Sequence, residues 1–416
     1  MNLTRRQALA SAAAAAAAAP AALPPRRARG QAQATIRLGI LTDMSGPYRD
    51  LGGPLLEPCV RQAVQDSGAA ERGIAVEVLT ADHQNKVDVG LSIARQWFDV
   101  QGVDAVVDVN NSALALAVAP LAREKDKAQL NTGAGLSDLT GRACTPNLVH
   151  WTFDSWQLAH STCDALVRRG LDTWFFVTAD YAFGHSMQRD AEEFVKAAGG
   201  RVLGAVRHPF PSTTDFSSYL LQAQSSRAKV VGFANSGADL INCVKQAAEF
   251  GVTRRGARLA GLVTYINDVH AIGLQHAQGL SLAEPFYWDL NERTRAFTAR
   301  VKPHMGAVVP NMEQAGAYSG VLHYLKVAGQ MGAGRAKESG RAVIEAMKRL
   351  PTDDDAFGPG RVREDGRKLH PSYLFEVKKP EESAGPWDYY KLVATTPLEQ
   401  AFRPLEQGGC PLVGRT

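Results

Sequence analysis

Seven short loops carry the side chains in this sequence that could bind a small molecule. Each loop follows an apolar run suited to a buried strand, and together the loops supply Ser, Thr, Asn and Gly with interspersed Tyr, Phe and Trp. Glycines admit a ligand to the backbone, hydroxyls and helix N-terminal amides satisfy a carboxylate or carbonyl group, and aromatic rings cover an apolar body. The loops are TDMSGPY, VNNSA, LNTGAG, TADYAFG, ANSGAD, VTYIND and EPFYWD.

The sequence lacks the common motifs that would indicate an enzyme active site at these loops. There is no Gly-x-Gly-x-x-Gly opening a helix, no phosphate-binding loop, no Gly-x-Ser-x-Gly elbow and no His-Glu-x-x-His pair. The ten histidines are scattered, and the five cysteines have no zinc-type spacing. We therefore expect a binding protein that is not an enzyme and uses no cofactor and no metal ion.

The first 34 residues have the pattern of an export leader. The Arg5 and Arg6 pair precedes an alanine-rich run that is shorter than the about 20 apolar residues a membrane crossing needs. Ala32 and Ala34 form a small-residue cleavage pattern, so the mature chain is predicted to begin at Thr35 in the periplasm. The arginine pair resembles a twin-arginine leader, but the usual large apolar residue is missing after it, which leaves the general secretory route open.

Removing the leader changes the charge balance of the chain. The whole sequence has a formal net charge of +4, but the leader holds five arginines and no acidic residue. The remainder has 41 basic and 42 acidic side chains, which is a net charge of −1. A near-neutral mature chain gives no support for a nucleic-acid partner or an anionic membrane partner.

Apolar runs and helical periodicities alternate along the mature chain, which is typical of parallel strands joined by helical crossovers. About 380 residues suggest two lobes, each a doubly wound parallel sheet flanked by helices. Segments after residue 284 are expected to be shared between the lobes. Strands are predicted near 36–43, 74–82, 103–110, 128–135, 173–180, 201–209, 228–235 and 258–265, and helices near 53–68, 86–100, 112–125, 186–200, 238–251, 292–302, 313–331 and 338–350.

Two of the five cysteines are predicted to form a disulfide. Cys144 and Cys410 lie in Gly- and Pro-rich loops, GRACTPN and QGGCPLVG. Cys59, Cys163 and Cys243 fall within helical patterns, where a small buried thiol is the ordinary interpretation. The disulfide would tie the C-terminal tail to the edge of the first lobe.

Five segments, in order along the mature chain, resemble the periplasmic substrate-binding proteins of branched-chain amino-acid type ABC transporters. The resemblance implies a type I periplasmic-binding-protein fold that closes on a small solute and delivers it to an inner-membrane ABC permease. It also implies a monomer whose two lobes are joined by three hinge crossings, near 151–155, 282–285 and 371–375. Lobe 1 would comprise 35–153 and 284–371, and lobe 2 would comprise 154–283 and 372–416. The segments are RLGILTDMSGPYRDLGG, NTGAGLSDLTG, TADYAFGHSMQRDAEEFVKAAGG, DFSSYLLQAQSSRAKVVGFANSGAD and AQGLSLAEPFYWD.

The resemblance, taken with the loop chemistry, assigns the ligand-contacting positions. The carboxylate end would be held by hydroxyls and backbone amides of the first lobe, and aromatic rings would close over the body from the second. More ordinary interpretations remain open: Ser112 as a helix cap, Gly133 and Gly135 as turn formers, and the second-lobe rings as core. The predicted contacts are Ser45, Tyr48, Asn111, Ser112, Thr132, Ala134, Gly135, Tyr181, Phe183, Asn235, Ser236, Val263, Tyr265 and Trp288.

Val263 is the position that bears on the ligand class. The resemblance places it where amino-acid binders carry the acid that receives the ligand's ammonium group. An apolar residue there predicts a non-amino carboxylate, of benzoate or phenylpropanoid type, in preference to leucine or valine. A receptor for branched-chain or other amino acids or amides, an exported sensor protein and an exported enzyme remain alternatives.

Overall fold

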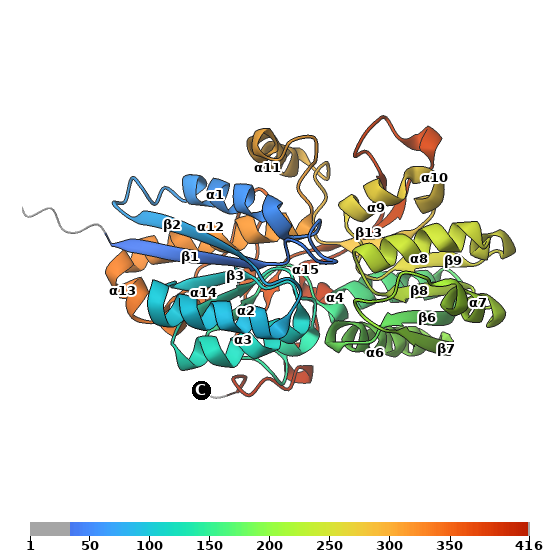
Figure 1. Ribbon diagram of the computed structural model, residues 1–416, viewed down its shortest axis with the longest axis horizontal. Helices are drawn as coiled ribbons and strands as arrows, with labels where there is room; N and C mark the ends of the chain where they lie inside the picture. The colour runs from blue at the N-terminus through green and yellow to red at the C-terminus, as the bar shows by residue number, and fades with distance from the viewer. Residues whose placement is uncertain (1–33, 415–416) are drawn as a thin grey trace, which may run out of the picture. The chain divides into compact units, whose positions relative to one another are not determined.

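Two sheets flanked by helices make up the computed structural model, which describes residues 34–414 (Figure 1). The predicted leader lies outside the described residues except for Ala34. The first sheet has the strand order β2-β1-β3-β4-β5, and all of its neighbours are parallel. Its strands are β1 (Thr35–Thr42), β2 (Ala75–Asp82), β3 (Ala105–Asp108), β4 (Ala128–Asn131) and β5 (Leu148–His150).

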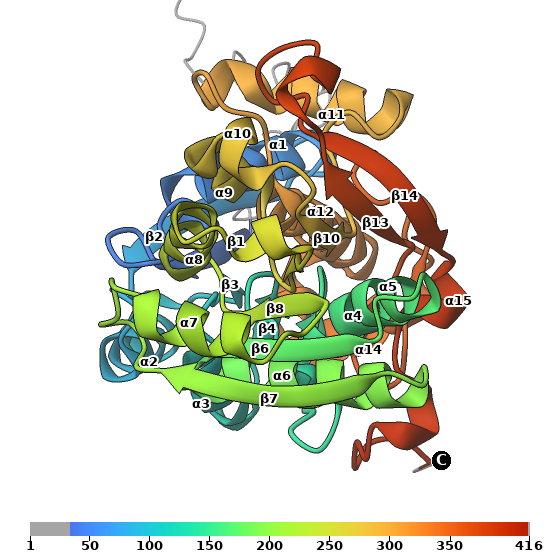
Figure 2. The same cartoon turned by 90° about the vertical axis from the view of Figure 1, so that its right-hand side faces the viewer.

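The second sheet repeats this order and adds two antiparallel strands. Its order is β14-β13-β10-β9-β8-β6-β7, with only the β10–β13 and β13–β14 pairs antiparallel. Figure 2 shows β7 and the β13–β14 pair at opposite sides of this sheet. The strands are β6 (Thr173–Ala179), β7 (Arg201–His208), β8 (Val230–Ala234), β9 (Arg258–Gly261), β10 (Ser281–Glu284), β13 (Ser372–Val377) and β14 (Tyr390–Thr396).

Helices cover both sheets, and most lie where the 3.6-residue periodicity predicts them. The first lobe contains α1 (Leu56–Asp66), α2 (Val87–Gln96), α3 (Ser112–Glu124), α12 (Met312–Met331), α13 (Ala333–Glu338) and α14 (Gly340–Arg349). The second contains α4 (Ser155–Ala159), α5 (Ala165–Arg168), α6 (Ala182–Ala197), α7 (Ser217–Ser225), α8 (Ala238–Glu249), α9 (Ile266–Ile272) and α10 (Leu274–Ala277). Helices α11 (Glu292–Val301) and α15 (Leu398–Ala401) and the strand pair β11 (Arg361–Val362) and β12 (Lys368–Leu369) lie in the connecting segments.

Burial explains why the strands have the sequences they do. Every residue of β3, β4, β6 and β8 is buried, because helices cover both faces of the sheet centres. Such strands need continuous apolar runs. At the edge of the second sheet, β7 alternates exposed and partly buried residues over most of its length. No helix within residues 34–414 has both the length and the apolar character that a membrane crossing requires.

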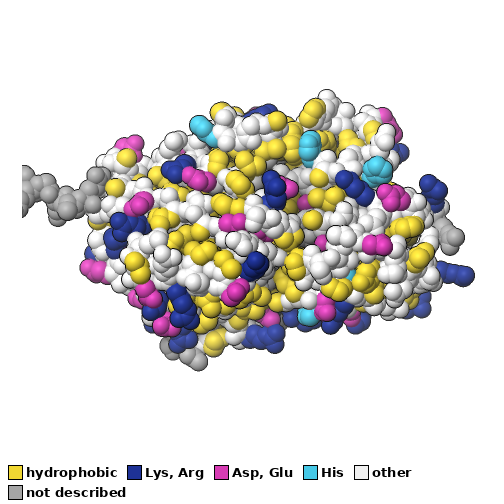
Figure 3. Space-filling view, in the orientation of Figure 1, with side chains coloured by type: hydrophobic (Ala, Val, Ile, Leu, Met, Phe, Trp, Pro, Cys, Tyr) yellow, Lys and Arg dark blue, Asp and Glu magenta, His cyan; other side chains and the backbone are white. Residues whose placement is uncertain are grey.

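The chain passes between the lobes where the crossings were predicted. It leaves the first sheet after β5, returns from the second after β10, and joins the second again at β13. This arrangement confirms the predicted two-lobed α/β fold. On the face shown in Figure 3, basic and acidic side chains are interspersed, as the near-neutral charge of the mature chain suggests.

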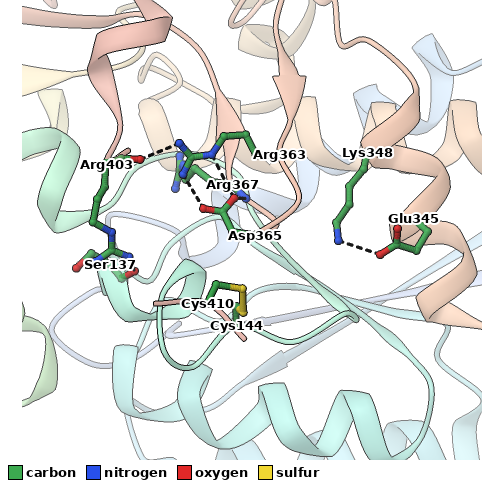
Figure 4. Close-up of a disulfide and its surroundings, with 9 residues drawn as sticks. All are labelled: Ser137, Cys144, Glu345, Lys348, Arg363, Asp365, Arg367, Arg403 and Cys410. Atoms are coloured by element: carbon green, nitrogen blue, oxygen red, sulfur yellow. Dashed lines mark hydrogen bonds and ion pairs between the residues drawn. A yellow bond between two sulfur atoms is a disulfide. The ribbon is translucent and has the colours of Figure 1, made fainter. Parts of the chain in front are cut away.

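The C-terminal tail makes a further passage between the lobes, as the predicted disulfide implied. It forms β14 in the second sheet and then contacts the first lobe, where Arg403 Nη2 donates to the Ser137 carbonyl at 3.0 Å. Cys410 in this tail is joined to Cys144 by a disulfide, with 5.6 Å between the Cα atoms (Figure 4). The predicted disulfide is therefore confirmed. Cys59, Cys163 and Cys243 are free and buried, as expected.

Candidate functional site

A small cavity lies between the two lobes, beyond the carboxyl ends of their strands. In each sheet the strand order reverses beside the first strand, at β1 and β3 in one and at β6 and β8 in the other. Ligands of open parallel sheets bind at such reversal points. The first lobe contributes Tyr48, Leu51, Asn110, Ser112, Gly133, Gly135 and Glu313, the first crossing contributes Phe153, and the second lobe contributes Tyr181, Phe183, Ser236, Val263 and Tyr265.

Four helices begin at this cavity, two from each lobe. Ser112 is the first residue of α3, and Glu313 is the second residue of α12. Phe183 is the second residue of α6, and Ser236 directly precedes the N-cap of α8. The first turn of a helix has backbone N–H groups without intrahelical partners and carries a partial positive charge. Four such ends create a positive potential that suits an anionic ligand.

A loop organised by Asp43 positions Tyr48. The buried carboxylate of Asp43 accepts hydrogen bonds from the backbone N–H of Gly46 at 2.7 Å and of Tyr48 at 3.0 Å. These bonds fold the loop after β1 so that the Tyr48 ring lines the cavity. Ser45 is exposed on the other side of the turn, where its hydroxyl donates to Asp82 Oδ2 at 2.6 Å. The structure thus brings only one of these two predicted contacts into the cavity.

Two tyrosines join the lobes at the edge of the cavity. The Tyr48 hydroxyl of the first lobe and the Tyr181 hydroxyl of the second form a hydrogen bond. The Phe210 ring stacks on both, with centroid distances of 5.5 Å to Tyr48 and 4.3 Å to Tyr181. Burial raises the pKa of both hydroxyls, so they stay protonated at neutral pH. We call Tyr48, Tyr181 and Phe210 the tyrosine bridge.

Glu313 is an acidic group that the sequence did not predict in this cavity. Its Oε1 accepts from Asn110 Nδ2 at 3.1 Å, and its Oε2 accepts from the Tyr265 hydroxyl at 2.8 Å. The second bond crosses between the lobes, because Tyr265 caps α9 while α12 packs on α1. The acid in this cavity thus comes from α12, while the predicted contact Val263 lines the wall as an apolar residue.

A second buried carboxyl lies beside Glu313. Asp108, at the end of β3, is fully buried, and its Oδ1 and Glu313 Oε1 both lie beside Gly133, 2.5 Å and 2.7 Å from where a Cβ on that glycine would be. Burial raises the pKa of Asp108 to about 6, and burial together with the Asp108 charge raises the pKa of Glu313 well above its usual value. Burial and the mutual repulsion of the two charges therefore favour protonation within this pair.

Eight of the predicted contacts line the cavity together. The ordinary interpretation of Ser112 as a cap is wrong, because Asn111 is the N-cap of α3 and accepts from the backbone N–H of Leu114. A Cβ on Gly135 would lie 2.9 Å from the Phe153 ring and 3.2 Å from the Phe183 ring, so this glycine leaves room between two lining rings. The eight are Tyr48, Ser112, Gly135, Tyr181, Phe183, Ser236, Val263 and Tyr265.

The other predicted contacts lie outside the lining, mostly one residue away from it. Successive side chains in an extended segment point to opposite sides, so Asn111, Ala134 and Asn235 lie behind neighbours that do reach the cavity. Asn235 Nδ2 donates to Cys243 Sγ at 3.3 Å inside the second lobe. The Thr132 hydroxyl donates to Asp108 Oδ1 at 3.0 Å.

Trp288 lies elsewhere in the second lobe. Its indole N–H donates to the Trp387 carbonyl at 2.8 Å. The preceding residues of the same aromatic run, Phe286 and Tyr287, are buried in hydrophobic cores. None of the three lines the cavity. The lining residues that the sequence analysis did not assign are Leu51, Asn110, Gly133, Phe153 and Glu313.

Comparisons with known proteins cover nearly all of the described chain. The family model described as "Periplasmic binding protein" matches residues 35–385. The "Leu/Ile/Val-binding protein homolog 6" of Brucella melitensis is 24% identical over 360 residues, which cover 83% of this chain and 88% of the relative.

Solved structures agree with this match. A periplasmic binding protein from Burkholderia mallei is 45% identical, with a TM-score of 0.86, over 91% of this chain and 99% of that one. A branched-chain amino acid ABC transporter periplasmic ligand-binding protein from Burkholderia xenovorans is 39% identical, with a TM-score of 0.81 and the same coverage. A solute-binding protein from R. palustris in complex with 4-hydroxybenzoate is 22% identical, with a TM-score of 0.79, over 88% and 98% of the two chains.

Proposed function

The chain belongs to the periplasmic binding protein family, whose members are extracytoplasmic receptors of ABC importers, and we propose that its ligand is a small aromatic carboxylate. Benzoate and phenylpropanoid acids represent the proposed class. The ligand would occupy the cavity between the lobes and be released to an inner-membrane permease. No catalytic role is proposed for any lining residue.

The observation that carries this proposal is the convergence of four helix N-termini on one small cavity. Backbone N–H groups in the first turn of a helix suit a carboxylate, although Asn111 and Asn311 already accept from such groups in α3 and α12. Ser236 adds a hydroxyl that is buried and has no hydrogen-bond partner in the described residues. A buried hydroxyl without a partner carries a free-energy cost that a bound carboxylate would remove.

The opposite wall supports an aromatic body. Phe153, Phe183 and Tyr265 line the cavity, and Val263 adds an apolar contact. Each well-placed aromatic pair contributes about 0.5–1.5 kcal/mol beyond the burial of its area. The 4-hydroxybenzoate held by the R. palustris protein is a ligand of this chemical class, although that protein is similar only in fold.

A branched-chain amino acid is the second candidate, and Glu313 is the observation that favours it. An ammonium group beside Glu313 would stabilise the ionised carboxylate. Glu313 would then supply the negative charge that the apolar side chain of Val263 does not supply. The similarity to the Burkholderia xenovorans protein points the same way. In the unliganded cavity, however, burial and the Asp108 charge favour the protonated form of Glu313, and both of its oxygens already accept hydrogen bonds, which favours the plain carboxylate.

Calorimetric titration with benzoate, 3-phenylpropanoate and leucine tests the proposal. We expect heat from at least one aromatic acid and weaker binding or none with leucine. Tight leucine binding with no response to either aromatic acid would instead establish the second candidate. Thermal unfolding with the same three compounds gives an independent measurement, since a bound ligand raises the unfolding temperature.

A matched pair of variants locates the site. Ser236→Ala should weaken benzoate binding without destabilising the unliganded protein, because the hydroxyl it removes has no partner. Thr178→Val is the control: the Thr178 hydroxyl is also buried without a partner, but this residue lies in β6 and does not line the cavity. Equal loss of affinity in both variants would contradict the assignment.

The export leader remains part of the proposal. The family match begins at residue 35, which is where cleavage after Ala34 would start the mature chain. N-terminal sequencing of exported protein is the test, and material that still begins at Met1 would contradict the proposed cleavage.

A further inference from the structure

Glu313 occupies an unusual place, because it connects three elements that belong to both lobes. Asn110 follows β3 of the first lobe, α12 carries Glu313 itself, and Tyr265 caps α9 of the second lobe. The carboxyl is completely buried when these contacts are made. Separation of the lobes would remove the Tyr265 hydroxyl and admit water to the carboxyl.

The surroundings of Glu313 contain more acid than base. Asp108 contacts it directly, and Asp268 lies on α9 behind Tyr265. His83 at the end of β2 reaches the same network, since its Nε2 lies 2.9 Å from Asn110 Oδ1, but burial lowers the pKa of His83 and keeps it neutral. Asp43, after the end of β1, adds no positive charge to these surroundings because it is itself an acidic residue. Its carboxylate accepts hydrogen bonds from the backbone N–H groups of its own loop.

We propose that closure of the lobes on a carboxylate ligand takes up a proton on Glu313, so that the ligand binds beside a neutral Glu313 carboxyl. This inference rests on the proposed function and adds a residue that determines which ligand charge the cavity accepts. Exposed glutamate has a pKa of about 4.3 and is ionised at neutral pH. In the closed form, burial, the Asp108 charge and the charge of the ligand all favour the protonated carboxyl.

The sign of the pH dependence follows from proton linkage. The closed, liganded form binds more protons than the open form at pH values between the two pKa values of Glu313. Affinity for a plain carboxylate is therefore greatest at low pH and falls as pH rises through that interval. Full coupling of one proton changes the dissociation constant by about tenfold for each pH unit.

Benzoate titration calorimetry in two buffers of different ionisation enthalpy, phosphate and Tris, measures the proton directly. At about pH 7 we expect the binding enthalpy to differ between the buffers by an amount that corresponds to uptake of up to about one proton. The dissociation constant should rise between about pH 6 and about pH 8. Because this measurement uses the unaltered protein, it does not depend on the folding of a variant.

Two glutamine variants assign the proton to its residue. Glu313→Gln should abolish the proton uptake and flatten the pH profile of binding. Glu284→Gln is the matched control, because Glu284 is equally buried and accepts from a tyrosine hydroxyl, that of Tyr390 at 2.6 Å, but both residues lie in the second sheet. Its proton uptake should equal that of the unaltered protein.

The outcomes separate this inference from the proposed function. Benzoate binding with the same enthalpy in both buffers, or undiminished proton uptake in Glu313→Gln, would overturn the inference and leave the aromatic ligand in place. Absence of benzoate heat in every buffer would overturn the proposed ligand, and the inference with it.

Discussion

Two of the groups of side chains that join the lobes differ in chemistry and in surroundings. At the cavity, the tyrosine bridge and the Glu313–Tyr265 bond join segments that no nearby backbone connects. Beside the first crossing, the carboxylate of Asp190 accepts from Ser137 and Ser155 and is held by Arg189. We call Ser137, Ser155, Ser186, Arg189 and Asp190 the hinge cluster.

The difference between the contacts at the cavity and the hinge cluster indicates that the two groups have different roles. The hinge cluster lies near a backbone crossing and near the disulfide-tied tail, whose Arg403 also donates to Ser137 (Figure 4). Its contacts can persist while the distant side of the cleft opens. The tyrosine bridge has no covalent support and must break when a ligand enters between the lobes. We therefore expect changes in the hinge region to alter stability and changes at the tyrosine bridge to alter ligand affinity.

Removal of the disulfide should have the largest effect. The double variant Cys144→Ser with Cys410→Ser opens a covalent loop of sequence separation 266, which runs through the whole second lobe. The chain-entropy model gives a loss of about 5–6 kcal/mol in the free energy of unfolding. Urea unfolding without reductant is the measurement. Reductant should destabilise the unaltered protein and leave the variant unchanged; an unaltered midpoint in the variant would show that the tail adds no constraint.

Truncation of Asp190 should have an intermediate effect. Asp190→Ala leaves the buried hydroxyls of Ser137 and Ser155 without their acceptor, which should cost about 1–3 kcal/mol of unfolding free energy. Benzoate affinity should change much less than stability. A larger effect on affinity than on stability would contradict the division between hinge and cavity.

The charge of Asp190 can be tested separately with Asp190→Asn. Burial raises the pKa of Asp190 in spite of the adjacent Arg189. A carboxyl whose folded pKa exceeds its unfolded pKa stabilises the protein at low pH, and this contribution is lost as pH rises through the folded pKa. The asparagine variant should therefore show a smaller decline of stability over that interval in urea unfolding at a series of pH values.

The same comparison shows what the sequence could predict. The sequence predicted residues of the cavity lining that lie within a single strand-end loop. The signal is local, because it consists of an apolar run followed by Ser, Gly and an aromatic residue. Tyr48, Ser112, Phe183 and Ser236 are examples, and all four line the cavity. The disulfide was also predictable, because only two cysteines lie outside helical patterns.

Features that depend on contacts between distant segments were missed. Glu313 begins a helix like many other surface glutamates, and nothing nearby in the sequence shows that Asp108 and Tyr265 will surround it. The final strand, β14, lies in a polar segment with half-exposed residues, so its apolar signal is weak. Trp288 follows a strand end but packs toward Trp387, because the antiparallel edge of the second sheet supplies a nearer partner.

The smallest effect is expected from Tyr181→Phe, which tests the tyrosine bridge directly. The variant keeps the ring that stacks on Phe210 and removes one hydroxyl of the hydrogen bond to Tyr48. One such bond contributes about 0.5–1.5 kcal/mol, so benzoate affinity should fall by at most about tenfold while the unfolding midpoint stays nearly constant. Tyr219→Phe is the control, because that ring packs near His208 within the second lobe and does not line the cavity. If Tyr181→Phe lowered stability as Asp190→Ala does and left affinity intact, the bridge would be a permanent contact, and the cleft would have to open elsewhere.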